Sequence, residues 1–339
     1  MTPPDTPVSP RRSSGIGILV LVALCIFAAG LSLVTGPAPI GWGDVSRAVL
    51  GQGDPVIRSV VMEIRLPRLI LSLSVGATLA LTGAALQGYL RNPLADPSVL
   101  GASGAAALGA VVALYFGLAA VTPAALPLMA IGSAVIGLSF VMALSRRADS
   151  PLTLILAGIA VGTLSGAAIS LALNLSANPF SGMEITFWLL GSLEDRSMTH
   201  VALALPSMVA GCALLMWDGR GLDALALGED AAEALGFNLS HVQWRVVAGV
   251  ALAVGGAVAV SGTIGFVGLV VPHIIRLLGN VPPSRILLPS ALAGAALLTV
   301  ADVAVRLVPA TTELRLGVVT AMLGVPFFLH LLTRRRAPA

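Results

Sequence analysis

The feature that most constrains this chain is a series of long segments without a charged residue. Only 10% of its 339 residues are charged, whereas 57% are hydrophobic. About 20 consecutive apolar residues suffice to cross a bilayer as an α-helix, and most of these segments reach that length. We therefore predict an all-α, polytopic membrane protein. The uncharged segments cover residues 13–43, 69–90, 97–145, 150–183, 197–217, 246–275, 286–301 and 316–333.

The positions of arginine orient the predicted spans. Cytoplasmic loops of membrane proteins collect basic residues, so we place Arg11 and Arg12 on the cytoplasmic side. The remaining arginines then fit ten spans with both termini in the cytoplasm. Residues 1–14 are predicted to be a disordered tail, 15–333 the transmembrane domain and 334–339 a second tail. The spans are expected near residues 15–34, 67–90, 97–118, 126–144, 152–173, 199–217, 244–261, 264–278, 286–305 and 317–333.

Two further observations bear on this map. Trp42 and Trp188 fall near predicted outer span ends, and Trp217 and Trp244 fall near inner ones. Tryptophan favours the membrane–water interface, so these positions agree with the map. A cleaved signal peptide is the alternative interpretation of the first apolar segment. That segment lacks a clear A-x-A cleavage site and is followed by further spans, which favours a retained helix.

The composition argues against several functions. All 19 basic residues are Arg, and a Walker A phosphate loop requires a Lys, so we expect no ATP site of that kind. Cys25 and Cys212 lie within apolar segments and are expected to be packed, unpaired thiols. The net charge is +3 with scattered arginines, which does not support nucleic-acid binding. No H-E-x-x-H motif, Cys/His cluster or nucleophile–base set is visible, so we expect no cofactor, metal or enzyme activity.

One predicted cytoplasmic segment is unusually acidic. In "LALGEDAAEALGFN", residues 225–238, three acidic side chains fall within five positions of a largely uncharged chain. Read as a helix, it gathers Leu and Ala on one face, with acidic residues in the first turn and a closing glycine. We predict that this face fits a groove on another protein; a helix packed on its own domain is the alternative. The residues assigned to the contact are Gly228, Glu229, Asp230, Ala231, Ala234, Leu235 and Gly236.

The second unusual segment is "EIRLPRLILSLS". Pro67 is expected in the first turn of a span, which places Arg65 and Arg68 at an outer helix N-terminus, against both the positive-inside rule and the helix dipole. Arg306, at another predicted outer span end, would extend the same positive surface. We predict that this surface binds an acidic soluble partner. The alternatives are arginines that snorkel to lipid headgroups and, for Arg306, pairing with Asp302 one turn earlier.

A transporter driven by an ion gradient is the competing functional hypothesis. Such transporters keep ionisable residues near the bilayer midplane. The predicted map places essentially none there, and Asp302, the nearest, falls close to a span end. This pattern disfavours ion coupling.

Four segments in this order resemble the FecCD-type permeases of bacterial ATP-binding-cassette (ABC) importers for iron-siderophores, haem and cobalamin. They are "RLPRLILSLSVGATLALTGAALQGYLRNPLADPSVLGASGAAALGA", "LALGEDAAEALG", "SGTIGFVGLVVPHIIRLLG" and "ELRLGVVTAMLGVPFFLHLL". The resemblance covers about residues 15–333. Arg315 is a departure, because the family usually has "ELP" before "GVVTA" and this chain has "ELRLGVVTA".

The resemblance implies a permease subunit of the bacterial cytoplasmic (inner) membrane, with partner ATPases, an external binding protein and a second permease. It implies an iron-siderophore as the first choice of cargo, with haem and cobalamin as alternatives. By the same resemblance, Arg65, Arg68 and Arg306 receive acidic residues of the binding protein. Residues 228–236, within a coupling segment at 219–240, would dock in an ATPase groove, and spans five, eight and ten would line the pathway.

Overall fold

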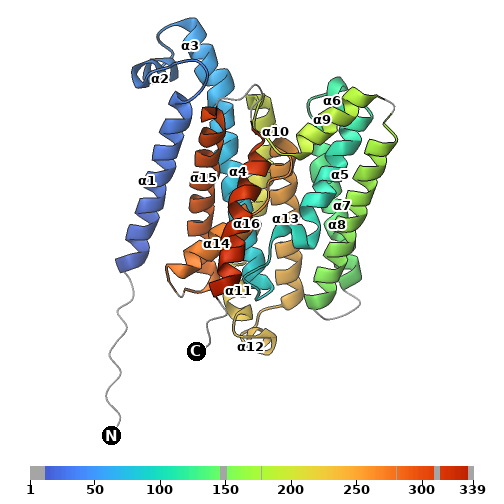
Figure 1. Ribbon diagram of the computed structural model, residues 1–339. Helices are drawn as coiled ribbons and strands as arrows, with labels where there is room; N and C mark the ends of the chain where they lie inside the picture. Colours follow the sequence, from blue (N-terminus) through green and yellow to red (C-terminus); the bar gives the residue numbers. More distant parts are fainter. Residues whose placement is uncertain (1–11, 146–150, 177, 280, 309–313, 335–339) are drawn as a thin grey trace.

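The computed structural model describes residues 12–145, 151–176, 178–279, 281–308 and 314–334. These ranges contain helices and no strand, which confirms the predicted all-α fold. Most long helices run side by side as one bundle (Figure 1). The helices are α1 (Arg12–Val34), α2 (Trp42–Val49), α3 (Pro55–Ser59), the π-helix η1 (Val60–Arg65), α4 (Leu66–Tyr89), the 3₁₀-helix η2 (Pro97–Leu100), α5 (Ala102–Tyr115), α6 (Leu118–Val121), α7 (Ala125–Ser145), α8 (Pro151–Asn174), α9 (Pro179–Leu189), α10 (Met198–Trp217), α11 (Gly219–Leu225), α12 (Glu229–Ala234), α13 (Leu239–Ser261), α14 (Val267–Leu277), α15 (Pro283–Leu307) and α16 (Leu316–Arg334).

Ten helical segments correspond in order to the ten predicted spans. Seven of those in the described ranges are long and apolar enough to cross a membrane, and α5, α14 and the first part of α16 are shorter apolar helices. Helix α1 begins at Arg12, so residues 12–14 of the predicted disordered tail are helical. Residues 1–11 and 335–339 of the predicted tails lie outside the described residues. The long segments are Gly15–Val34, Pro55–Tyr89, Ala125–Ser145, Leu152–Asn174, Met198–Trp217, Leu239–Ser261 and Pro283–Leu307.

The second span begins earlier than predicted. We expected its start at Pro67, whereas the helical segment runs without a break from Pro55 to Tyr89. Proline has no N–H to donate, and the wider π-turns of η1 directly before it are a local backbone adjustment of the kind found within longer helices. Arg65 and Arg68 therefore do not stand at a helix N-terminus. The predicted conflict with the helix dipole is absent.

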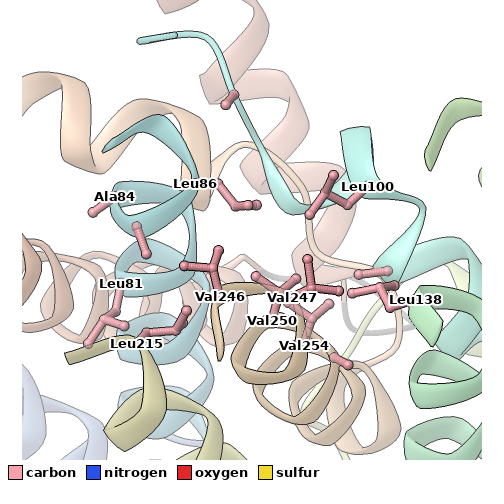
Figure 2. Close-up of a cluster of buried hydrophobic side chains, with 14 of the residues drawn as sticks. Leu81, Ala84, Leu86, Leu100, Leu138, Leu215, Val246, Val247, Val250 and Val254 are labelled. Carbon is pink, nitrogen blue, oxygen red and sulfur yellow. The ribbon is translucent and has the colours of Figure 1, made fainter. Parts of the chain in front are cut away.

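Helices α4 and α13 form the centre of the bundle. In each, 78% of the most apolar window is buried, against 11% in α1. Glycines allow neighbouring helices to approach α4 closely: a Cβ at Gly76 would lie 2.2 Å from the carbonyl oxygen of Gly294 on α15. Figure 2 shows the hydrophobic side chains of this core, in which Leu86 of α4 faces Val246 of α13.

The bundle has two distinct ends. Helices α2 and α3 lie at one end, and α12 lies at the other, where α1 begins and α16 ends (Figure 1). We call these the α2 end and the α12 end. Helix α1 lies at the periphery and packs mainly against α15.

Candidate functional site

The predicted docking arginines gather at the α2 end, and two of them share one carboxylate. Asp302 of α15 pairs with Arg68 of α4 and with Arg306 one turn further along α15, each at 2.9 Å. The Asp302 side chain is 1% exposed, Arg306 5% and Arg68 12%. The pairing of Asp302 with Arg306, considered from the sequence, is confirmed. Two cations and one anion thus form a buried network that joins α4 to α15.

Two of these arginines also hold the C-terminus of α1. The guanidinium of Arg65 donates to the carbonyl oxygens of Leu33 and Val34 at 2.6 and 2.8 Å, and that of Arg306 donates to the carbonyl oxygen of Ser32 at 3.0 Å. The last carbonyls of a helix have no partner within the helix and carry the negative end of its dipole. The positive charges of these arginines therefore offset the negative end of the α1 dipole. The cations that seemed misplaced in the sequence compensate a helix terminus in the same chain.

The arginines do not form the exposed positive face that the sequence suggested. Arg65 is only 4% exposed. All three instead line a cavity of about 470 Å³, whose lining also includes Glu194, Asp195 and Arg196. A carboxylate from another protein would meet the arginines only inside this cavity. The sequence could not reveal this, because Arg68 and Asp302 lie 234 residues apart.

Arg315, the departure from the family pattern, contacts two other elements at the α2 end. It pairs with Glu194 at 2.9 Å and its guanidinium lies 5.2 Å from the ring centre of Phe187 in α9. The start of α16 is thereby joined to α9 and to the segment after it. A backbone hydrogen bond from Gly317 to the carbonyl of Gly191 at 3.3 Å makes a second connection between the same regions.

A larger cavity, of about 690 Å³, adjoins this contact between α9 and α16. Its walls come from the loop after α4, from η2, and from α9, α14 and α16. The predicted eighth and tenth spans thus contribute to it, whereas the predicted fifth span, α8, supplies none of the described lining residues. Its lining is mainly apolar, with Asp96, Ser98, Ser103 and Thr263 as polar members. Across the described residues, no group of three His, Cys, Asp or Glu side chains could hold a metal ion.

At the α12 end, the acidic segment forms the predicted short helix between two glycines. Gly228 and Gly236 have φ of +114° and +85°, a left-handed backbone that glycine adopts without strain. Ala232 is fully buried against the bundle, whereas Leu227 and Leu235 are 70% and 61% exposed. Of the predicted apolar face, Ala234 and the two leucines that flank α12 are exposed, whereas Ala231 is half-buried. Helix α12 therefore packs on its own chain through Ala232 and leaves the two leucines beside it exposed.

Helix α12 rests on a part of the structure that the sequence analysis missed. Helix α11 is largely buried and packs against α4, α15 and α12. Asp223 accepts hydrogen bonds from the backbone N–H and the hydroxyl of Ser284 in α15, at 2.8 and 2.6 Å. Asp218 pairs with Arg245 of α13 at 2.8 Å. Burial raises the pKa of Asp218, and the hydrogen bond from Arg245 opposes that shift.

We call α11 and its contacts with the neighbouring helices the platform of α12. Its signal in the sequence was too weak to use. In the sequence, three residues look like ordinary charged members of a cytoplasmic loop: Asp218, Asp223 and Arg245. Only the fold shows that each has a partner on another helix. The same applies to Arg91, which pairs with Glu229 of α12 at 3.0 Å.

Comparisons with known proteins agree with this arrangement. Residues 22–334 match the model of the FecCD transport family. The cobalamin import system permease protein BtuC of Halobacterium salinarum is 42% identical over 83% of this chain and 75% of its own length. The Fe(3+) dicitrate transport system permease protein FecD of Escherichia coli K12 is 38% identical over 95% of this chain and 99% of its own.

A solved structure is similar over nearly the whole chain. It is an inward-facing conformation of an ABC transporter assigned provisionally to the metal-chelate type. The TM-score is 0.84, with 30% sequence identity and coverage of 94% of this chain and 98% of that one.

Proposed function

Since the chain belongs to the FecCD transport family of ABC importer permeases, we propose that it carries a metal chelate across the cytoplasmic membrane, powered by partner ATPases. Two copies of a permease, or this chain and a paralogue, would enclose the pathway. The α12 end would face the cytoplasm, and with it both termini. The large cavity beside α14 and α16 would form part of the pathway wall.

The observation that carries the proposal is the pair of exposed leucines that flank α12, a helix that packs on α11. Leu227 and Leu235 lie open to solvent, a position that is unfavourable unless another surface covers them. Movement of a partner pressed against this face would pass through α11 to α15 and α4, because α11 packs on both. ATP-driven closure of the partner would thereby bias the spans between two arrangements. The chain itself, without lysine, would depend on that partner for ATP.

At the opposite end, we propose that the arginine-lined cavity receives an acidic group of the external binding protein. Arg65, Arg68 and Arg306 supply the positive charge, and the cavity of about 470 Å³ can admit a side chain. The arginines would then serve two roles, since they also hold α1. A contact at this site would act directly on the packing of α1, α4 and α15.

The cargo class follows from the relatives. The permeases of similar sequence are named for cobalamin and for ferric dicitrate, both of which are metal chelates. We propose an iron-siderophore complex first; a ferric dicitrate permease is 38% identical to this chain over 95% of its length, which supports this choice within the class. Cobalamin and haem are the other members of the class to test.

The test is uptake by proteoliposomes that contain this chain with its co-purified ATPase and binding protein. Uptake of labelled ferric siderophore, haem and cobalamin is compared with ATP and with an imposed ion gradient. Glu233→Pro places a helix breaker beyond the first turn of α12, and Glu233→Ala at the same exposed position is the matched control. Loss of ATP-dependent uptake in Glu233→Pro alone, in an intact complex, supports the proposal. Unchanged uptake, or uptake that follows the ion gradient, contradicts it.

A further inference from the structure

Helix α2 presents three different sides. Val45 and Ala48 are 7% and 2% exposed and pack into a small hydrophobic cluster at the α2 end. At about 100° per residue, Trp42 and Val49 share a second side, and Asp44 and Arg47 lie opposite to it. Asp44 and Arg47 form an exposed ion pair at 2.9 Å. The helix thus has one apolar edge and one charged edge in addition to its buried side.

The apolar edge is open to the surroundings. Trp42 and Val49 are 63% and 56% exposed, and the adjoining Leu50 is 72% exposed. Three large apolar side chains exposed on one short helix and its end are uncommon on a face that meets only water. They therefore call for a covering medium or partner.

The contact of Trp42 with α1 identifies that medium. A Cβ on Gly30 would lie 2.8 Å from the indole of Trp42, so the ring rests directly on the backbone of α1. Gly30 lies four residues before Val34, the end of α1, which places it about 6 Å down the helix axis. Helix α1 packs mainly against α15, and only 11% of its most apolar window is buried, so the side that is turned away from α15 is left for lipid. Trp42 is thus held at the depth of a lipid boundary.

The position of α2 in the fold agrees with this assignment. Helix α1 lies at the edge of the bundle, and α2 lies beyond its end on the same side (Figure 1). A helix in this place extends laterally over the bilayer rather than over the bundle. An interfacial helix typically buries its apolar face about 5–10 Å into the boundary between headgroups and acyl chains, which matches the depth of Gly30.

We propose that α2 is an interfacial helix that lies on the membrane leaflet at the α2 end, with Trp42, Val49 and Leu50 in the lipid and Asp44 and Arg47 in water. The partner is the phospholipid bilayer itself. Because Trp42 is seated on Gly30 and Val45 packs into the hydrophobic cluster, α2 also fixes the depth at which α1 ends. This inference rests on membrane insertion and not on the identity of the cargo.

Spin labels on the two edges test the proposal in the assembled importer. Cys25 and Cys212 are replaced by alanine, cysteine-free partners are used, and a label is placed by Val49→Cys or by Arg47→Cys. In phosphatidylethanolamine–phosphatidylglycerol vesicles, collision with oxygen, which enters lipid, is compared with collision with a water-soluble nickel chelate. We expect a severalfold higher oxygen-to-nickel ratio at position 49 than at position 47.

Two outcomes would overturn the proposal. Equal, water-like ratios at both positions would place the apolar edge in solvent. Protection of position 49 from both reagents would show that a protein covers it, whether the binding protein or a second copy of the chain.

A second pair of variants tests whether the contact of Trp42 with Gly30 positions α2. Gly30→Leu displaces the indole, whereas Gly17→Leu on the same helix meets no neighbour within 4 Å. The label at position 49 should become more accessible to the nickel chelate in Gly30→Leu and stay unchanged in Gly17→Leu. An unchanged ratio in both would show that Trp42 does not set the depth of α2.

Discussion

The two ends of the molecule differ in the burial of their unusual residues. At the α2 end, three arginines turn inward and find partners in their own chain, namely Asp302 and the carbonyls of α1. At the α12 end, leucines turn outward and find no cover in the bundle. In the sequence, both segments seemed to call for an external partner. Burial distinguishes them, since a charge that is already paired needs no second protein for its stability, whereas an exposed apolar face gains from one.

The largest expected effect comes from removing the shared carboxylate. Asp302→Ala leaves two buried arginines without their anion, and breaking a buried pair typically costs about 3–5 kcal/mol. Thermal unfolding of the purified chain in lipid nanodiscs measures the change. Asp44→Ala, which removes an exposed ion pair, is the control and should have little effect. Equal stability of the two variants would show that the buried network does not hold the α2 end together.

The next effect concerns the opposite end. Leu235→Ala removes an exposed side chain whose burial against a partner is worth about 1.5–3 kcal/mol. Affinity for the ATPase should fall about tenfold to a hundredfold, with little change in the stability of the chain alone. Titration of the ATPase onto nanodisc-bound permease measures this, with Glu233→Ala as control. An affinity equal to that of the parent chain would remove the assigned role of the exposed face.

A smaller effect is expected at Arg315. Its partly exposed pair with Glu194 should contribute about 0.2–1 kcal/mol, and its contact with Phe187 about 0.5–1 kcal/mol. A double-mutant cycle of Arg315→Ala and Glu194→Ala, read by thermal unfolding, isolates the ion pair. Arg315→Lys, which keeps the charge but alters the planar group, is the conservative control. Strictly additive losses would mean that the two side chains act independently.

The smallest effect is expected for Arg91 and Glu229, whose side chains are each 44% exposed. Exposed pairs contribute about 0.2–1 kcal/mol and are screened by salt. Arg91→Ala should therefore change stability only at low ionic strength, and the difference should vanish in concentrated salt. A loss that persists in salt would indicate that this residue supports the platform under α12 in another way.

The sequence predicted what depends on local pattern. The ten spans follow from runs of apolar residues, and α12 follows from the alanines and acidic residues between Gly228 and Gly236. It failed where the deciding contact is distant. Arg68 meets a carboxylate 234 positions away, and Asp223 finds Ser284 on another helix. The π-helix before Pro67 was missed because proline usually marks a helix start.

The attachment of α1 has a consequence for the order of assembly. This helix is made before α15, yet it packs mainly on α15, and Asp302, which pairs with Arg306, one of the two arginines that cap α1, lies at position 302 of 339. Translation proceeds at about 5–20 residues per second, so α1 spends tens of seconds in the bilayer before its docking surface exists. Only 11% of its most apolar window is buried in the finished molecule, so most of that window can remain in lipid during this interval. Helix α1 is therefore made long before α15, its main packing partner. A chain truncated before residue 302 would lack both Arg306 and the carboxylate that pairs with it.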